Sequence, residues 1–301
     1  MKTLKYYLQK AYKEYWAIGQ FNFSDFSQVK GIVQAAQNLR SPIILGTSEG
    51  ESKFVDLQEA VAIVDILRKK TGLPIFLNLD HGKSFEYLKE AILAGYDMVC
   101  FDGSKLTLDE NIKVSSQVVK FALQHGSGKA KKEVVVEGEV GRFGTDASRV
   151  YQEKFEIKEE DLTNPDDAQK YLSKTGVDVL AVSVGTFHGI DVSGVSPHIR
   201  LDRLKALRLA LLAQGKTKPI GFVLHGGSGT PEEDLKEAIK LGVVKININT
   251  DTRLAFTNAL RKTLELNKEE IVPYKYLPEA VSAVRRIVEE KIKLFGSSNK
   301  Q

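Results

Sequence analysis

The chain has 301 residues, of which 42% are hydrophobic and 27% charged, and it contains one cysteine. This length can bury a full hydrophobic core, and a lone Cys100 excludes both a disulfide framework and a Cys-rich zinc fold. A net charge of +4, spread along the chain, is too small to indicate nucleic-acid binding.

The N-terminal segment carries charges throughout and has no apolar core, so it does not have the pattern of a signal peptide. The longest apolar runs, such as residues 177–184, are far shorter than the roughly 20 residues that a membrane helix needs. We therefore expect a cytoplasmic protein that binds neither a membrane nor nucleic acid.

Short apolar runs alternate with longer amphipathic segments along the whole chain. Continuous apolar runs are typical of parallel strands that are buried on both faces. They predict eight strands, at residues 17–23, 42–46, 74–80, 97–102, 133–140, 178–184, 219–225 and 243–249. The amphipathic segments predict helices at residues 27–39, 54–70, 84–94, 108–125, 166–175, 201–214, 231–241, 251–265 and 278–294.

Eight strand-then-helix units predict an α/β fold, a (β/α)8 TIM barrel, in which residues 1–301 form a single domain with an additional C-terminal helix. A doubly wound sheet is the alternative, but it would show fewer strands and a glycine-rich first turn. Asn164 is a predicted helix cap, and Thr230 is predicted to start the next-to-last barrel helix with a capping box. The longest irregular stretch, residues 141–163, is expected to be a functional lid or disordered.

Three of the five histidines follow predicted strands. His81, His188 and His225 end strands three, six and seven, and active sites of barrels lie at the C-terminal ends of the strands. Three imidazoles that converge from different strands form a catalytic zinc site with an open fourth position. The alternative is three unrelated polar loop residues. His125 and His198 are predicted to be structural.

Acidic side chains fall at the same strand ends. Asp80 directly precedes His81, Asp102 ends strand four, and Glu137 and Glu139 share one face of strand five. A buried pair of carboxylates is unfavourable unless it meets a cation or a proton. Glu139 is the predicted metal ligand, with Asp102 in a second or alternative metal position. Glu137 is predicted either to join this site or to form hydrogen bonds inside the barrel.

Polar loops follow the last two predicted strands, and each precedes a helix. Gly226, Gly227 and Ser228 come after strand seven, and Asn249 and Thr250 come after strand eight. Glycine-loop N–H groups beside a helix N-terminus bind phosphate, and barrels commonly bind phosphate after these two strands. The two loops therefore predict a phosphate site.

Lys245, Asn247 and Asn249 alternate along strand eight and so face one side of it. If that side is the lumen, Lys245 could act as a Schiff-base nucleophile. We favour the alternative, an ion pair with Glu137 or another inward acid, because Lys245 lies below Asn247 and away from the rim.

Five motifs occur in order along nearly the whole chain. They are NLDHG (78–82), VEGEVG (136–141), VGTFHG (184–189), LHGGSGT (224–230) and KININTDT (245–252). With these motifs the sequence resembles the class II, metal-dependent ketose-bisphosphate aldolases.

The resemblance implies that His81, His188 and His225 bind a catalytic zinc ion. Asp102 and Glu139 would match a second metal position, for a second divalent or a monovalent cation. Asp80 would be the acid/base that moves the C4 hydroxyl proton, and Asn247 would contact the enediolate. The implied substrate contacts are Asn22, Ser48, Gly189, Gly226, Gly227, Ser228, Asn247, Asn249 and Thr250.

The implied reaction is the reversible cleavage of fructose or tagatose 1,6-bisphosphate to dihydroxyacetone phosphate and glyceraldehyde 3-phosphate, by a homodimer or homotetramer. Three features depart from the family pattern. Residues 188–194, HGIDVSG, lack the lysine that often follows the HG motif and helps to hold phosphate. Ala147 stands where many members have a loop acid, and Tyr274 stands where an arginine often binds the far phosphate. An aldolase for another phosphorylated sugar and a non-catalytic sugar-phosphate-binding barrel are the alternatives.

Overall fold

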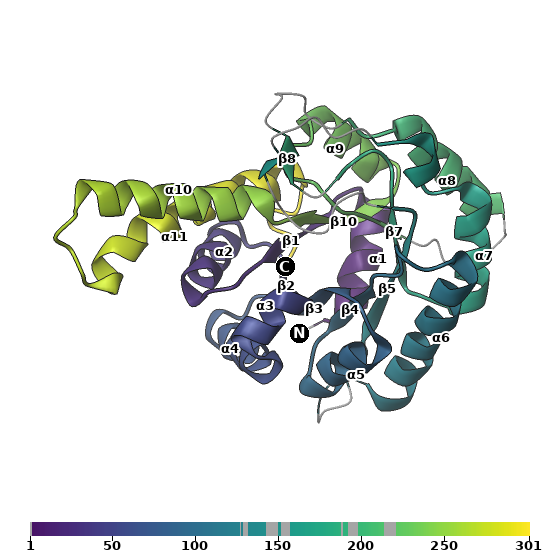
Figure 1. Cartoon of the computed structure of the whole chain (residues 1–301), viewed down its shortest axis with the longest axis horizontal. Coiled ribbons are helices and arrows are strands. Elements are labelled where there is room, and N and C mark those ends of the chain that lie inside the picture. The colour runs from purple at the N-terminus through teal and green to yellow at the C-terminus, as the bar shows by residue number, and fades with distance from the viewer. Residues whose placement is uncertain are drawn as a thin grey trace.

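The computed structural model describes residues 2–126, 128, 132–142, 150–151, 157–187, 189–191, 198–213 and 221–301. Eight parallel strands close into a barrel, in the order β1, β10, β9, β7, β5, β4, β3, β2 (Figure 1). They are β1 (Ile18–Asn22), β2 (Ile43–Ser48), β3 (Ile75–Gly82), β4 (Met98–Phe101), β5 (Val135–Val140), β7 (Val179–Val182), β9 (Gly221–Leu224) and β10 (Val243–Ile248). The predicted TIM barrel and its eight strands are confirmed.

Helices lie around the outside of the barrel and, in the case of the first, across one end of it (Figure 1). They are α1 (Leu4–Glu14), α2 (Phe26–Leu39), α3 (Glu49–Val55), α4 (Leu57–Thr71), α5 (Phe85–Ala94), α6 (Leu108–His125), α7 (Pro165–Thr175), α8 (Leu201–Ala213), α9 (Glu232–Lys240), α10 (Thr250–Leu266) and α11 (Pro273–Leu294). The sequence prediction missed α1 and residues 49–53 of α3, and it joined the end of α3 to α4 in one helix at residues 54–70. Asp56 separates these two helices, because it takes a positive φ of 74° and its side chain caps α4.

The predicted irregular stretch includes two short regular elements among its described residues. It contains β6 (Val150–Tyr151) and the short 3-10 helix η1 (Glu159–Asp161), and β6 pairs with β8 (Ile190–Asp191) outside the barrel. Asn164 caps α7 as predicted, since its side chain accepts from two backbone N–H groups of the first turn. The predicted capping box at Thr230 is wrong, because this hydroxyl donates to the carbonyl of Gly226 and leaves α9 without a side-chain cap.

Side chains that point into the barrel change from apolar to polar along its axis. At the N-terminal ends of the strands, apolar side chains fill the interior and form one cluster with α1, which closes this end. Two residues further along the strands, the period-two alternation brings polar side chains inward. This fully buried layer consists of Gln20, Asn78, Glu137 and Lys245. The layer above it forms the C-terminal rim.

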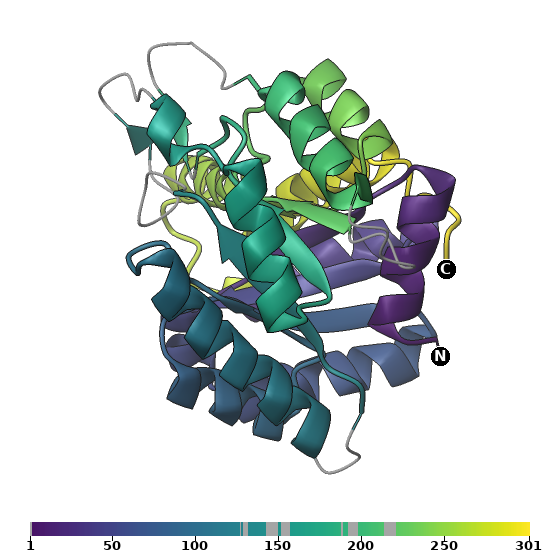
Figure 2. The same ribbon diagram turned by 90° about the vertical axis from the view of Figure 1, so that its right-hand side faces the viewer.

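Both ends of the chain lie beside α1, at the closed end of the barrel (Figure 2). The last residues are tied there, because Gln301 N–H donates to the carbonyl of Arg40, just before β2 begins. Among the described residues, no helix is long and apolar enough to cross a membrane.

Helices α10 and α11 run side by side and extend away from the barrel as an arm (Figure 1). The second part of α11 packs against α2 with buried Val284, Val288 and Ile292. This part confirms the predicted C-terminal helix. The helix begins at Pro273 rather than at residue 278, so Pro278 lies inside it.

Candidate active site

Strand β3 brings two consecutive residues, Asp80 and His81, into the same site. Successive strand residues normally point to opposite faces. Here His81 takes a left-handed φ of 52°, and the pairing of β3 with β4 shifts register between Leu79 and Gly82. A positive φ is uncommon for a residue with a side chain, and it marks a backbone held for a purpose. The kink places the acid beside the imidazole.

Two amides hold the Asp80 carboxylate. Asn22 donates to Oδ2 at 3.1 Å and Asn247 donates to Oδ1 at 3.0 Å. Burial by itself would raise the pKa of this carboxyl, but the cationic side chains around it and the hydrogen bond from Asn22 hold the pKa well below its usual range. Asp80 is therefore ionised and can accept a proton.

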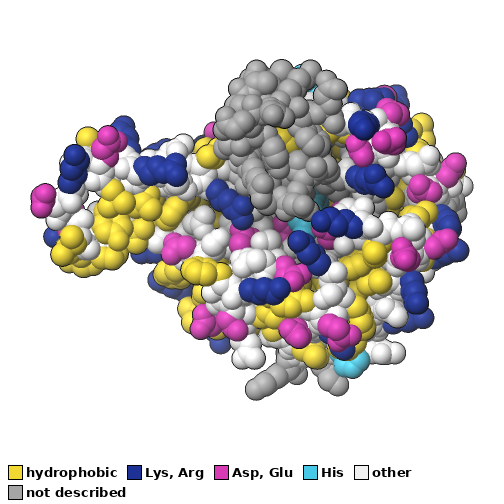
Figure 3. Space-filling view, in the orientation of Figure 1, with side chains coloured by type: hydrophobic (Ala, Val, Ile, Leu, Met, Phe, Trp, Pro, Cys, Tyr) yellow, Lys and Arg dark blue, Asp and Glu magenta, His cyan; other side chains and the backbone are white. Residues whose placement is uncertain are grey.

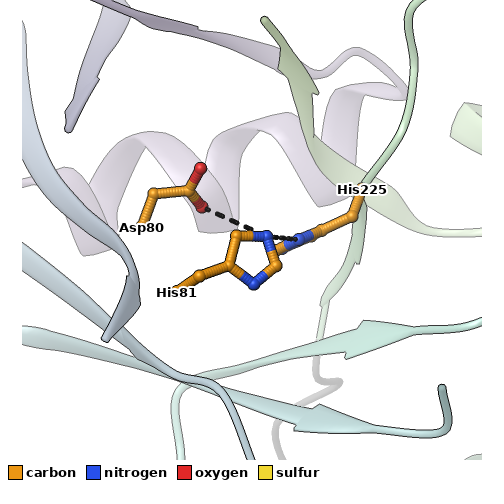
Figure 4. A group of neighbouring side chains, drawn as sticks. All are labelled: Asp80, His81 and His225. Carbon is orange, nitrogen blue, oxygen red and sulfur yellow. Dashed lines mark hydrogen bonds and ion pairs between the residues drawn. The ribbon is translucent and has the colours of Figure 1, made fainter. Parts of the chain in front are cut away.

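His81 and His225 point toward each other and toward Asp80 (Figure 4). Nε2 of His81 lies 2.9 Å from Nδ1 of His225 and 4.0 Å from Oδ1 of Asp80. The other ring nitrogen of His225, Nε2, donates to Oε1 of Glu137 at 2.7 Å, which leaves a lone pair on Nδ1.

Lys245 forms an ion pair with Glu137. Its Nζ lies 2.7 Å from Oε2, and neither side chain is exposed. Burial opposes ionisation of Glu137, but Lys245 and His225 outweigh it and lower the pKa of this carboxyl to about 2. The predicted pairing of Lys245 inside the barrel is confirmed. A buried, ion-paired ammonium is not a free amine, so the Schiff-base alternative is disfavoured.

Two further carboxylates face the opposite nitrogen of His81. Its Nδ1 lies 3.4 Å from Oε2 of Glu139 and 3.6 Å from Oδ2 of Asp102. Glu139 is fully buried, and this oxygen has no hydrogen-bond partner among the described residues. A proton on Nδ1 can therefore point at these acids, and it leaves the Nε2 lone pair facing His225.

Two lone pairs 2.9 Å apart repel each other unless a cation lies between them. In the protein alone this cation is a proton: burial disfavours it, but Asp80, Asp102 and Glu139 together raise the pKa of His81 well above its usual value. A metal ion would serve the same purpose, and imidazole nitrogens with nearby carboxylates are ligands that suit zinc. The residues therefore fit a bound divalent metal.

The described residues contain three sets of ligand atoms that could hold such an ion. Two of them share His81: one is Asp80, His81 and His225, and the other is His81, Asp102 and Glu139. The third is Cys100, Glu137 and His225, in which Glu137 is already paired with Lys245. His81 belongs to the first two sets through different nitrogens, so its ring links the two predicted metal positions. The third predicted zinc ligand, His188, and the loop position Ala147 lie outside the described residues.

The predicted phosphate loops meet at one corner of the rim. Gly226 has a φ of 69°, and a Cβ there would lie 2.3 Å from the carbonyl oxygen of Phe187, so only glycine fits. Ser228 Oγ accepts from the backbone N–H of Asp251, which joins the loop after β9 to the start of α10.

Neither helix that begins at this corner is capped by the side chain of its own N-cap residue. The helices α1 to α7 have such a cap, whereas α9 and α10 do not, and in α10 the Asp251 N–H donates to Ser228 instead. The buried Oδ1 of Asn249 has no hydrogen-bond partner among the described residues. Uncapped helix N-termini leave N–H groups free for an anion. Gly189, Gly227 and Thr250 are also buried.

At the ends of β1 and β2, the predicted residues Asn22 and Ser48 contact Glu51, which the sequence prediction missed together with its partner Arg253. The buried carboxylate of Glu51 accepts from the backbone N–H of Ser48, from the Asn22 side chain and from Arg253 of α10. Both N–H groups of the Asn22 amide are thus used, one for Glu51 and one for Asp80. Asn22 therefore positions Asp80 in this structure.

The remaining sequence candidates lie away from this site. Tyr274 is exposed in the first turn of α11, at the tip of the arm, so it cannot reach the site of its own chain (Figure 1). His125 and His198 are exposed, as expected for structural residues, and contact the carbonyl of Phe121 and the carboxylate of Asp234.

Comparison with known proteins decides the family. The family model described as fructose-bisphosphate aldolase class-II matches residues 2–300. The chain belongs to this family. A probable fructose-bisphosphate aldolase of Bacillus subtilis is 35% identical over 295 residues, covering 97% of this chain and 96% of the relative.

Other similar proteins carry different substrate names. A 6-phospho-5-dehydro-2-deoxy-D-gluconate aldolase of Shouchella clausii is 36% identical and covers 97% of this chain and 94% of its own. Among solved structures, the YdjI aldolase of Escherichia coli K12 superposes with a TM-score of 0.77 at 26% identity, covering 99% of this aldolase and 98% of its own chain. Membership of the family therefore establishes the aldolase reaction, but it does not identify the phosphorylated sugar that is the substrate.

Proposed function

We propose that this class II aldolase is zinc-dependent and reversibly cleaves a ketose 1,6-bisphosphate to dihydroxyacetone phosphate and glyceraldehyde 3-phosphate. Fructose 1,6-bisphosphate is the first candidate substrate. The observation that carries this proposal is the ionised Asp80 carboxylate 4.0 Å from the imidazole nitrogen that faces His225. A base and a metal position lie side by side, as cleavage of a carbon–carbon bond next to a carbonyl requires.

His81, His188 and His225 would hold the zinc ion, with Asp102 and Glu139 around a second cation position. When bound, the ion polarises the substrate carbonyl and stabilises the negative charge that develops on its oxygen. Asp80 removes the C4 hydroxyl proton in cleavage and returns it in synthesis. Glu137 and Lys245 fix which nitrogen of His225 carries its proton, because the buried carboxylate accepts only from an N–H.

The phosphate on C1 would bind at the corner where the loops after β9 and β10 meet. Gly226, Gly227 and Ser228 supply one side, with Gly189 beside them, and Asn249 and Thr250 open α10 on the other. Oδ1 of Asn247 has no hydrogen-bond partner in the part of the chain that the structure describes, so it can accept from a substrate hydroxyl. Ser48 and Asn22 line the other side, where Asn22 acts through Asp80.

One assay set tests this function. Zinc-loaded protein is mixed with fructose 1,6-bisphosphate or tagatose 1,6-bisphosphate, and triose phosphate is measured before chelation, after chelation and after zinc is restored. We expect cleavage that chelation abolishes and zinc restores. Activity that survives complete metal removal would contradict the proposal. Binding of dihydroxyacetone phosphate without turnover of any sugar would favour a non-catalytic binding barrel.

We also propose that two copies associate through the α10–α11 arm as a homodimer, which could pair further into a tetramer. Hydrophobic side chains gather on the surface of this arm (Figure 3). The large exposed ones are Leu264, Leu266, Ile271 and Tyr274. Light scattering should give at least twice the chain mass for the wild type and the chain mass for Ile271→Glu. A monomeric wild type refutes this assembly.

With one buried cysteine the chain needs no oxidising compartment, and we place it in the cytoplasm.

A further inference from the structure

We propose that Glu51 is a specificity-determining residue that holds Arg253 back from the far end of the substrate. The site would then accept ketose 1-phosphates with an uncharged far end as readily as bisphosphates. This inference rests on the proposed aldolase function and concerns the substrate class of the same site.

Glu51 joins three elements at the rim. It lies in the first turn of α3, directly after β2, and its side chain is only 6% exposed. Oε2 accepts from the Ser48 backbone N–H at 2.7 Å and from the Asn22 amide at 3.0 Å, while Oε1 accepts from Arg253. Arg253 stands one turn beyond the start of α10, so its side chain reaches across the rim to β2.

The two oxygens of Asp80 show which side of the site this pair occupies. Oδ1 faces His81 and Asn247, whereas Oδ2 accepts from the Asn22 amide that also reaches Glu51. Glu51 therefore lies on the side of Asp80 that faces away from the histidines. If Asp80 serves the C4 hydroxyl, this is the side toward which the aldehyde half of a ketose extends.

The pairing changes what Arg253 can offer to a substrate. A free guanidinium is a permanent cation with a planar set of donors that suits phosphate. Beside Glu51 the pair is neutral, and a second phosphate must either lie near a buried carboxylate or draw Arg253 away from it. Both are unfavourable, because like charges repel and a buried carboxylate needs its partner. Hydroxyl groups can bond to the intact pair.

Glu51→Gln removes the charge and keeps the local fold, because glutamine also serves at this position of a capping box. Glu49→Gln is the matched control: it removes a carboxylate from the same helix, and the described contacts of Glu49 are with Lys53 and the Lys83 backbone. Arg253→Gln removes the cation itself. Thermal unfolding of each zinc-loaded variant confirms that it is folded.

The measured quantity is the ratio of kcat/KM for fructose 1,6-bisphosphate to that for fructose 1-phosphate. Glu51→Gln should raise this ratio by about tenfold or more, equivalent to about 1.4 kcal/mol, mainly through a lower KM for the bisphosphate. Glu49→Gln should leave it within about twofold, well inside that tenfold step. Arg253→Gln should lower it, because the unpaired Glu51 carboxylate then repels the second phosphate. The double variant with Glu51→Gln should lie between the two single variants, because it lacks both the carboxylate and the cation.

An unchanged or lower ratio in Glu51→Gln refutes the role of Glu51, while cleavage by the wild type leaves the aldolase function standing. If the wild type cleaves neither ketose, the proposed function fails instead. Calorimetric Kd values of the same two ketoses then decide on Glu51: the ratio must shift in Glu51→Gln and stay constant in Glu49→Gln, and no shift refutes the inference.

Discussion

The ion pair between Lys245 and Glu137 tests how the barrel interior balances its charges. Neither side chain is exposed, and the ammonium nitrogen lies 2.7 Å from the carboxylate oxygen. Lys245→Met keeps most of the side-chain length and removes the charge. Among the described residues, Glu137 would then keep only its hydrogen bond from His225.

The expected loss of stability follows from this geometry. Removing one partner of a buried ion pair costs about 3–5 kcal/mol, because the other charge stays buried without compensation. An unfolding entropy of about 2.1 cal/mol/K per residue gives about 0.6 kcal/mol/K for 301 residues. The melting temperature of Lys245→Met should therefore fall by about 5–8 °C.

The assay is calorimetric thermal unfolding of the metal-free proteins, so that zinc binding does not contribute. The control is the double variant Glu137→Gln/Lys245→Met, which removes both charges. It should be more stable than Lys245→Met alone, since no unpaired carboxylate remains. A drop of less than about 2 °C in Lys245→Met, or a double variant that loses the sum of both single losses, would refute this reasoning.

Three further predictions concern the rim. Asp80→Ala should retain zinc by elemental analysis and lose about 10²–10⁴-fold in kcat, as expected for an acid/base; loss of the metal would make Asp80 a ligand instead. Zinc binding at pH 7 should release a proton, because the raised pKa keeps His81 protonated in the metal-free protein and the metal needs its lone pair. Calorimetry in buffers of different ionisation enthalpy measures this release, and equal apparent enthalpies would speak against it. Gly46→Ala puts a methyl group 2.4 Å from Oδ1 of Asn22, so stability should fall by about 1–3 kcal/mol and kcat should fall as Asn22 shifts from Asp80; wild-type values for both would show that the rim can relax.

Most of the barrel could be predicted because most strands are largely apolar runs and helix ends carry local signals such as Asn164 and Gly176. The helix α1 was missed although its buried residues, Leu4, Tyr7, Leu8 and Ala11, have helical spacing, because it precedes the first strand and lies outside the repeating strand-then-helix units. The break at Asp56 was missed because the apolar periodicity continues across it, whereas the break depends on one backbone angle.

The site was predictable to the level of residue types at strand ends. Asp80, His81 and His225 converge as expected, since the C-terminal ends of parallel strands share one rim. Sequence cannot show which imidazole nitrogen faces which partner, because this depends on the kink at His81. It also cannot pair Glu51 with Arg253, which are 202 residues apart and meet only through the closure of the barrel.

The helix α1, which closes the N-terminal end of the barrel, has a practical consequence. Because α1 and the apolar cluster seal that end, substrates have one way in and out, through the rim. The two chain ends emerge on the sealed side (Figure 2). A tag, a surface linker or a fused partner on either terminus would therefore point away from the mouth, so the protein can be immobilised with its site facing solution.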